Sequence, residues 1–260
     1  MPMIATTPFH APNRPAQRFR PFKAYGHFRK LVEDKEDTAQ VFYMSDHLPS
    51  RRSQRKAAAF CRSAVGQSLM VLEPYLPDIL DAHDTLLAMP RGSVAHAYVA
   101  FMRKEGLSAA GLVEASTVPG RKSYPDQMQW FMDRLRDTHD LAHILTGYGR
   151  DALGEQCVLG FTDGQHHDWT DWFIAWAGAL EFSRQVKSDA PVFKAVAEAQ
   201  RNGKTSVAIF AQDIRALLAE PLEVARARMR IRLPLVYEVA HQRLRARGFD
   251  PYNLPAPAAA

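Results

Sequence analysis

Two histidines and two carboxylates in the middle of the chain have the residue types and spacing of a divalent-metal site. They are His139, Asp140, His143 and Glu155. On a helix, residues i and i+4 lie about 40° apart around the axis, so the rings of His139 and His143 point toward a common position. Asp140, about 100° from His139, reaches an ion directly or through water. Two imidazoles and one or two carboxylates suit Zn²⁺, Fe²⁺ or Mn²⁺ and suit Ca²⁺ poorly.

The two histidines are predicted to lie on a helix over residues 125–147. Both fall on its apolar stripe, whereas Arg134, Arg136 and Asp137 are expected mostly on other faces. A lone histidine on an apolar face is usually a hydrogen-bonded core residue, but two at this spacing with an aspartate between them favour a metal site. The stripe consists of Met128, Phe131, Met132, Leu135, Ala142 and Leu145.

Turn signals at both ends of this helix position the carboxylates. Pro125 and Asp126 suit its first turn, and Gly147-Tyr148-Gly149 supplies a left-handed cap and a turn at its end. A second short helix that starts near Asp151 then returns Glu155 toward the first helix.

The motif is also similar to HExxH, in which the glutamate is the general base of metalloproteases. Here Asp140 stands at the second position and is one methylene shorter than glutamate. Its carboxylate falls short of the usual reach of that base, which disfavours a peptidase.

The whole chain is predicted to be all-α, because apolar residues recur at helical spacing and strand-like alternation is scarce. We predict a single-domain helical bundle over residues 22–247, a flexible, basic, proline-rich arm over 1–21 and a frayed tail over 248–260. Pro234 is expected to kink or divide the last helix. The helices are predicted over residues 22–47, 53–72, 76–88, 92–105, 125–147, 151–161, 167–187, 190–202, 205–219 and 221–247.

Composition narrows the classes of protein. The 260 residues, 47% of them hydrophobic, are enough for a substantial core. Cys61 and Cys157 make no disulfide framework, which favours a reducing compartment. No stretch approaches the roughly 20 apolar residues of a membrane-spanning helix, and there is no secretory signal.

The first 32 residues carry six lysines and arginines and no acidic residue, within a net charge of +5. Five prolines in this stretch disfavour the amphipathic helix of a transit peptide. A solvated basic tail that contacts anionic lipid is the simpler interpretation.

Aromatic and basic side chains outside the motif raise the question of a lipid ligand. The aromatic ones could line a sleeve for an apolar tail, although helix packing explains them more simply. Four arginines alternate along one segment, either as solvated charges or as ligands of anionic headgroups. The aromatic residues are Trp130, Phe131, Trp169, Trp172, Phe173, Trp176 and Phe182, and the arginines are Arg226, Arg228, Arg230 and Arg232.

Three other features are more easily explained as structural. His166-His167-Asp168 is metal-like in composition but stands at a predicted helix start, where Asp168 is a natural N-cap. His96 is expected to lie in the core or just outside the metal ligands. Cys157 is expected to be a buried small hydrophobe.

The segment 137–155, DTHDLAHILTGYGRDALGE, is similar to the signature of a ubiquinone-biosynthesis family, the one numbered four in the coenzyme Q pathway. The family pattern is HDxxH, eleven residues and Glu, and the chain has this pattern from His139 to Glu155. The segments 90–102 and 221–231 also resemble the family, so the resemblance covers about residues 90–247. Val-Ala replaces the family's Leu-Gly before His96, and the proline-rich arm has no counterpart.

This resemblance implies an all-helical protein, peripheral to a membrane, with a zinc-type site and an apolar cavity for a polyprenyl tail. His139, Asp140, His143 and Glu155 would be its metal ligands and its catalytic residues. Zn²⁺ is the expected metal, with Fe²⁺ and Mn²⁺ as alternatives. The implied function is the C1 oxidative decarboxylation of a polyprenylated aromatic precursor, a lyase reaction.

The implied partners are a polyprenylated aromatic or isoprenoid lipid, other ubiquinone-biosynthesis proteins, a membrane surface and a second copy of the chain, with no nucleic acid. The expected location is cytoplasmic and peripheral to the inner membrane in a bacterium, or the matrix side of the mitochondrial inner membrane in a eukaryote.

Two other functions stay open. One is a non-catalytic, lipid-binding scaffold that organises a quinone-biosynthesis complex, with the metal as a structural staple. The other is a soluble metallohydrolase, which the absence of a Ser or Cys nucleophile motif makes weaker.

Overall fold

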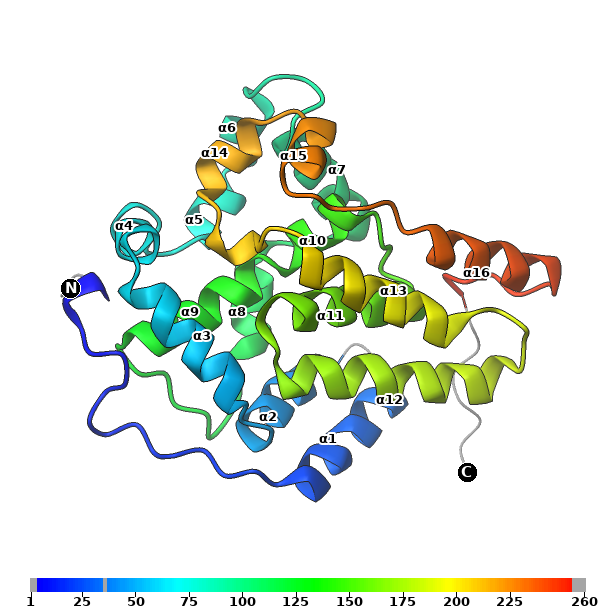
Figure 1. The fold of residues 1–260 in the computed structure, drawn as a ribbon, viewed down its shortest axis with the longest axis horizontal. Helices are drawn as coiled ribbons and strands as arrows, with labels where there is room; N and C mark the ends of the chain where they lie inside the picture. The colour runs from blue at the N-terminus through cyan, green and yellow to red at the C-terminus, as the bar shows by residue number, and fades with distance from the viewer. Residues whose placement is uncertain (1–3, 35–36, 254–260) are drawn as a thin grey trace. The chain divides into compact units, whose positions relative to one another are not determined.

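The computed structural model describes residues 4–34 and 37–253, and within these ranges every regular element is a helix (Figure 1). The predicted all-α class is therefore confirmed for the described residues. The chain divides into two compact units, and the single domain predicted over residues 22–247 stays a prediction. Residues 1–3 of the predicted arm and 254–260 of the predicted tail lie outside the described ranges. No helix in those ranges is long and apolar enough to cross a membrane.

Unit 1 comprises Met1–Gln17, Arg51–Leu145 and Ala208–Met229. It contains the HDxxH part of the motif, His139 to His143, and its middle segment ends at Leu145, near the end of the motif helix. Its elements are η1 (Ile4–Thr6), α3 (Arg51–Arg62), α4 (Ala64–Leu72), α5 (Pro77–Leu80), α6 (His83–Leu87), α7 (Val94–Glu105), α8 (Ala109–Ser116), α9 (Gln127–Asp137), α10 (His139–Thr146), η2 (Ile209–Ala211), α14 (Ile214–Ala219) and α15 (Leu222–Arg228).

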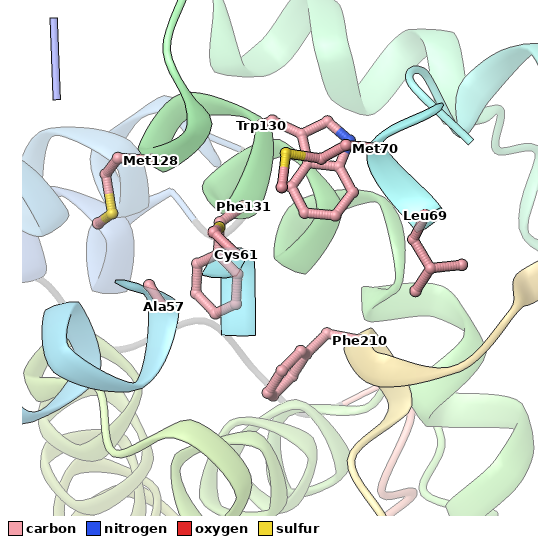
Figure 2. Packing of buried hydrophobic residues seen from close by; sticks show 8 residues of the cluster. All are labelled: Ala57, Cys61, Leu69, Met70, Met128, Trp130, Phe131 and Phe210. Atoms are coloured by element: carbon pink, nitrogen blue, oxygen red, sulfur yellow. The ribbon is translucent and has the colours of Figure 1, made fainter. Parts of the chain in front are cut away.

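A hydrophobic cluster between α3, α4, α9 and η2 forms the core of unit 1 (Figure 2). The ring of Phe60 contacts the rings of Trp130, Phe131 and Phe210 at centroid distances of 6.1, 6.0 and 5.2 Å. Edge-to-face and offset contacts of this kind add to the stabilisation from burial. The buried members are Ala57, Cys61, Leu69, Met70, Met128, Trp130, Phe131 and Phe210.

Residues of the predicted flexible arm contact the start of α9. The Gln127 and Met128 N–H groups donate to the carbonyl oxygens of Pro8 and Phe9 at 3.2 and 3.0 Å. Arg14 forms an ion pair with Asp126 through its Nε at 2.7 Å. Residues 4–14 therefore supply hydrogen-bond partners to α9, which the proline-rich composition did not suggest.

Unit 2 comprises Arg18–Ser50, Thr146–Val207 and Arg230–Ala260. One hydrophobic cluster of this unit joins α1, α2 and α12. Helices α11 and α13 pack at close range because glycines line their contact. A Cβ on Gly164 would lie 2.4 Å from the Gln200 carbonyl oxygen. The helices of unit 2 are α1 (Pro21–Glu33), α2 (Ala39–His47), α11 (Ala152–His166), α12 (Trp169–Val186), α13 (Val192–Thr205) and α16 (Leu235–Ala246).

Several predicted helices are divided in the structure. Ser63 separates α3 from α4, because its extended backbone and its hydroxyl, which accepts from Gly66 N–H at 3.1 Å, form an N-cap. Pro234 divides the last segment into α15 and α16, as predicted. Helix α8 was missed, since its Ala- and Gly-rich start has no clear apolar stripe.

Candidate metal site

Three of the four predicted ligands lie together on α10. One ligand atom from each of His139, Asp140 and His143 lies within 4.8 Å of the other two. The Nε2 atoms of the two histidines are 3.3 Å apart. Asp140 and His143 are buried, with 8% and 2% of their surfaces exposed, and His139 is half-buried. The spacing on the helix therefore produces the convergence that the sequence predicted.

The donor atoms fit a first-row divalent ion. Two imidazole nitrogens at about 2.0–2.1 Å from one tetrahedral ion would be about 3.4 Å apart. The Nε2–Nε2 distance of 3.3 Å is close to this value. Two nitrogens and one carboxylate oxygen are the ligand set of many zinc and iron sites, so this group could hold such an ion.

Helix α10 begins at a break in the helix predicted over residues 125–147. Thr138 interrupts it with φ −90° and ψ 2°, and its hydroxyl donates back to the Arg134 carbonyl oxygen at 2.8 Å. A threonine that bonds back in this way bends or ends a helix. Pro125 and Asp126 precede α9 instead of occupying its first turn. Asp126 is the N-cap, and its Oδ1 accepts from Gln129 N–H at 2.8 Å.

The carboxyl end of α10 is held by Arg226 from α15. The Arg226 guanidinium donates to the carbonyl oxygens of Leu145 and Ile144 at 2.9 and 2.8 Å. These carbonyls belong to the last turn of the helix, where intrahelical partners run out. Arg226 was expected to be solvated or to bind headgroups, and this anchoring role was missed because its partners lie more than 80 residues earlier. Gly147, just beyond, has φ 81°, the predicted left-handed conformation.

Helix α7 contributes an aromatic wall to the site. The ring of Phe101 stacks on that of His143 at a centroid distance of 5.6 Å and an interplanar angle of 24°. Tyr98, on the same helix, is fully buried. His96 lies elsewhere, with its Nε2 3.1 and 3.0 Å from the carbonyl oxygens of Leu87 and Met89. Its hydrogen bonds make it a structural histidine.

Glu155, the fourth predicted ligand, belongs to unit 2. It lies in the first turn of α11, and its Oε1 is 3.5 Å from the Arg150 Nε. Asp151 is the N-cap of that helix, so the predicted start is confirmed. Residues of α16 hold Asp151, since Tyr237 donates its hydroxyl to Oδ2 and His241 Nε2 lies 3.0 Å from Oδ1. The role of Glu155 as a metal ligand stays a prediction.

Arg134 does not point away from the core as predicted. Its side chain is 1% exposed and pairs with Glu73, also 1% exposed, at 2.8 Å. The guanidinium also donates to the carbonyl oxygens of Phe210 and Gln212. Tertiary partners from η2, from the residue after it and from the end of α4 therefore override the helical pattern, which gives no sign of them.

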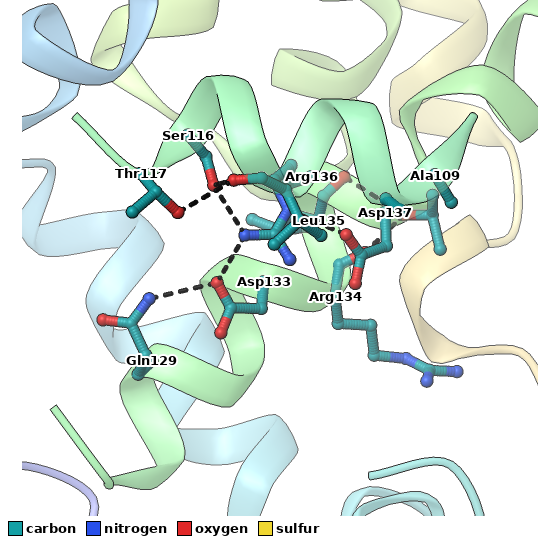
Figure 3. A network of polar contacts seen from close by, with 12 residues as sticks. Ala109, Ser116, Thr117, Gln129, Asp133, Arg134, Leu135, Arg136 and Asp137 are labelled. Carbon is teal, nitrogen blue, oxygen red and sulfur yellow. Dashed lines mark hydrogen bonds and ion pairs between the residues drawn. The ribbon is translucent and has the colours of Figure 1, made fainter. Parts of the chain in front are cut away.

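A polar network lies on α9 just before the motif (Figure 3). Arg136 donates to Asp137 at 2.8 Å, to Asp133 at 3.0 Å and to the Ser116 hydroxyl at 2.9 Å. Burial raises the pKa of Asp133, and it raises the pKa of Asp137 to about 6 despite Arg136. Asp133 and Asp137 also line a cleft of about 180 Å³ with Tyr75 and Trp130.

This cleft is smaller than the roughly 300–1,000 Å³ of most small-molecule pockets, and its lining includes the charged side chains of Asp133, Arg134 and Asp137. It does not have the character of a sleeve for a polyprenyl tail, so the predicted lipid cavity stays a prediction. Among the aromatic candidates, Trp130, Phe131 and Phe182 are buried in helix packing, which confirms the simpler interpretation for them. Trp169 and Trp172 are 48% and 40% exposed.

The remaining candidates have structural partners. Asp168 is the N-cap of α12, as predicted, and His166 Nε2 lies 3.2 Å from Asp171. Arg228 pairs with Glu220 at 2.8 Å. Cys157 is fully buried, and burial raises the pKa of its thiol, so it is the inert residue expected from the sequence.

Comparisons with known proteins agree with the motif. A family described as coenzyme Q (ubiquinone) biosynthesis protein Coq4 matches residues 34–234. A 2.85 Å crystal structure of a Nostoc punctiforme protein assigned to ubiquinone biosynthesis has a similar fold, with a TM-score of 0.58 and 18% identity over 81% of this chain and 98% of that chain. None of the curated proteins compared with the chain matches it. Because the family match spans most of the sequence, the chain belongs to the Coq4 family of ubiquinone biosynthesis proteins.

Proposed function

We propose that this chain is a metal-dependent enzyme that acts on the ring of a polyprenylated hydroxybenzoate and supports its C1 oxidative decarboxylation. The observation that carries the proposal is the convergence of His139, Asp140 and His143 on α10 in a member of the Coq4 family. Zn²⁺ is the proposed metal, with Fe²⁺ and Mn²⁺ as alternatives. Glu155 is proposed as a further ligand on the motif alone.

In this reaction the carboxyl group leaves as CO₂ and a hydroxyl takes its place on the ring, which requires an oxidant of the dioxygen class. A divalent ion, when bound, would stabilise the negative charge that develops on the ring oxygens. His139 and His143 would hold the ion, and Asp140 would supply an anionic ligand or accept a proton. Zn²⁺ has no redox chemistry, so a zinc enzyme requires a substrate that reacts with dioxygen directly.

The surroundings of α10 keep these groups in place. Phe101 restricts the ring of His143 by stacking on it, and Arg226 fixes the last turn of the helix. The buried position of Asp140 removes bulk water from its carboxylate, which strengthens its interaction with a bound cation. Preorganisation of this kind is how a site stabilises developing charge without moving.

A membrane surface is proposed as a partner, because α1 and the residues before it combine exposed aromatic and basic side chains. Phe19, Phe22 and Tyr25 are 59%, 90% and 54% exposed. Basic side chains next to exposed aromatic ones suit an anionic bilayer surface. A polyprenylated substrate resides in such a bilayer. The exposed basic side chains are Arg18, Arg20, Lys23, Arg29 and Lys30.

The alternative is a non-catalytic scaffold that binds the same lipid and presents it to other biosynthesis enzymes, with the metal as a staple. Contacts with those enzymes and with a second copy of the chain belong to the same set of proposals. Protein ligands that fill every coordination position of the metal would favour a structural role, and an open coordination position would favour catalysis.

The test is CO₂ release from a short-tailed prenyl dihydroxybenzoate-type acid, with metal analysis of the same sample. We expect turnover by the wild type and by His10→Ala, an exposed histidine outside the site, and none by His143→Ala. An absence of CO₂ with Zn²⁺, Fe²⁺ and Mn²⁺ in turn, together with retained lipid binding, would exclude the enzyme and support the scaffold.

A further inference from the structure

Two polar atoms beside the candidate metal site lack a hydrogen-bond partner among the described residues. They are the hydroxyl of Tyr98 on α7 and the Nε2 of His83, the first residue of α6. Both atoms are buried, and the Tyr98 side chain is fully enclosed. An unsatisfied buried polar group costs about 1–3 kcal/mol. Native proteins rarely keep two such atoms together unless something else binds them.

The two rings lie next to each other. Their centroids are 6.4 Å apart and their planes are nearly perpendicular. The same helix that carries Tyr98 also carries Phe101, which stacks on His143. Tyr98 is therefore on the helix that lines the candidate metal site, His83 lies beside it on α6, and all of these residues belong to unit 1.

The pair is complementary to a neutral hydroxyl group. Tyr98 O–H is a donor, and His83 Nε2 is an acceptor when Nδ1 carries the proton. A hydroxyl group accepts one hydrogen bond and donates another, so it satisfies both atoms. We propose that Tyr98 and His83 bind a ring hydroxyl of the aromatic ligand whose carboxylate is held at His139, Asp140 and His143.

The hydrogen-bonding capacity of the pair favours a hydroxyl over an anion. A carboxylate only accepts, so it would leave the His83 Nε2 acceptor unsatisfied, whereas a hydroxyl satisfies both atoms. The anionic end of the ligand belongs with the cation of the candidate metal site, and the neutral hydroxyl belongs with Tyr98.

This inference rests on the proposed function, and its test separates the two. Zinc-loaded wild type and Tyr98→Phe are titrated with a short-tailed 3-prenyl-4-hydroxybenzoate and with the corresponding 3-prenylbenzoate, which lacks the ring hydroxyl. We expect Tyr98→Phe to weaken binding of the hydroxylated compound about tenfold and to leave binding of the other unchanged. Its zinc content should equal that of the wild type.

Tyr43→Phe is the control, since Tyr43 on α2 is neither a metal ligand nor part of the Tyr98–His83 pair and stacks on His27 at a centroid distance of 5.1 Å. It should bind both compounds as the wild type does. If Tyr98→Phe loses equal affinity for both compounds, the change acts through packing. If it loses affinity for neither, only water occupies the Tyr98–His83 pair. Either result overturns this inference and leaves the proposed function standing. A wild type that takes up zinc but binds neither compound would overturn the proposed substrate class and this inference with it.

Discussion

At the scale of single residues, buried charges in this chain are held by partners distant in sequence. Arg134 and Glu73 form a buried ion pair that also ties the Phe210 carbonyl and the Arg215 N–H to it. Arg134 lies in the last turn of α9, which leads into the motif helix. Such a pair adds little net stability by itself, but the loss of one member leaves a buried charge without compensation.

Glu73→Ala is therefore expected to destabilise the protein by about 3–5 kcal/mol. Urea unfolding followed by circular dichroism measures this change. The control is Glu33→Ala, because Glu33 is 66% exposed and pairs with Arg29 at 3.7 Å on the surface. Its removal should change stability by less than about 1 kcal/mol. Similar losses in the two variants would argue against a structural role for the buried pair.

His166 should make the stability of the chain depend on pH. Burial lowers the pKa of His166, but Asp171, Asp168 and Asp163 outweigh burial, so the pKa lies above its ordinary value of 6.5. A raised histidine pKa stabilises the folded state fully below about pH 6.5, and this stabilisation is lost as the pH rises through the folded-state pKa.

We therefore expect the free energy of unfolding of the wild type to fall as the pH rises from 6 to 9. Unfolding free energies of the wild type and Asp171→Asn at several pH values test this expectation. The variant lacks the hydrogen-bonded partner of His166 and should show a smaller decline. An equal decline in both proteins would assign the pH dependence to other groups.

At the scale of elements, the sequence was sufficient to predict a helix over residues 139–146 and the convergence of His139, Asp140 and His143 on it, because both follow from helical spacing. It was insufficient for what holds α10, since Arg226 and Phe101 come from helices whose contacts with the motif are tertiary. The break at Thr138 was missed because it depends on one side-chain hydrogen bond. The helix start near Asp151 and the N-cap at Asp168 were predicted, since both are local properties of the sequence.

The close packing of α11 on α13 gives a prediction for an element as a whole. Gly164→Ala would place a Cβ 2.4 Å from the Gln200 carbonyl oxygen and 2.9 Å from the Lys204 nitrogen, both backbone atoms. The helices must separate, at an expected cost of about 1–3 kcal/mol.

The matched control is Gly26→Ala in α1, where a Cβ meets nothing within 4 Å. There alanine should stabilise the helix by up to about 1 kcal/mol. Thermal unfolding of the two variants measures both effects. Equal melting temperatures would show that α11 and α13 accommodate the methyl group.

At the scale of the whole molecule, the net charge of +5 is concentrated at the amino-terminal end of the chain. No helix in the described ranges could span a bilayer. The proposed association with a membrane would use exposed side chains such as Phe22 and its basic neighbours. This contact would depend on both apolar insertion and charge.

We expect the wild type to sediment with vesicles that contain anionic lipid, and to be released as the salt concentration rises. Phe22→Ser should weaken this binding severalfold, because it removes an aromatic ring that is 90% exposed. Phe193→Ser is the control, since Phe193 is 42% exposed on α13, outside this surface. Equal binding of the two variants, or binding to neutral vesicles alone, would contradict the proposed surface.

The central claim, that His139, Asp140 and His143 hold a divalent ion, is tested most directly by metal stoichiometry. The protein is stripped with a chelator, reloaded with Zn²⁺, Fe²⁺ or Mn²⁺ in turn, and its bound metal is measured. We predict one equivalent for the wild type and for His10→Ala, and loss of tight binding in His139→Ala and His143→Ala with the circular dichroism spectrum unchanged. Wild-type stoichiometry in both histidine variants, or no bound metal in the wild type, would contradict the claim.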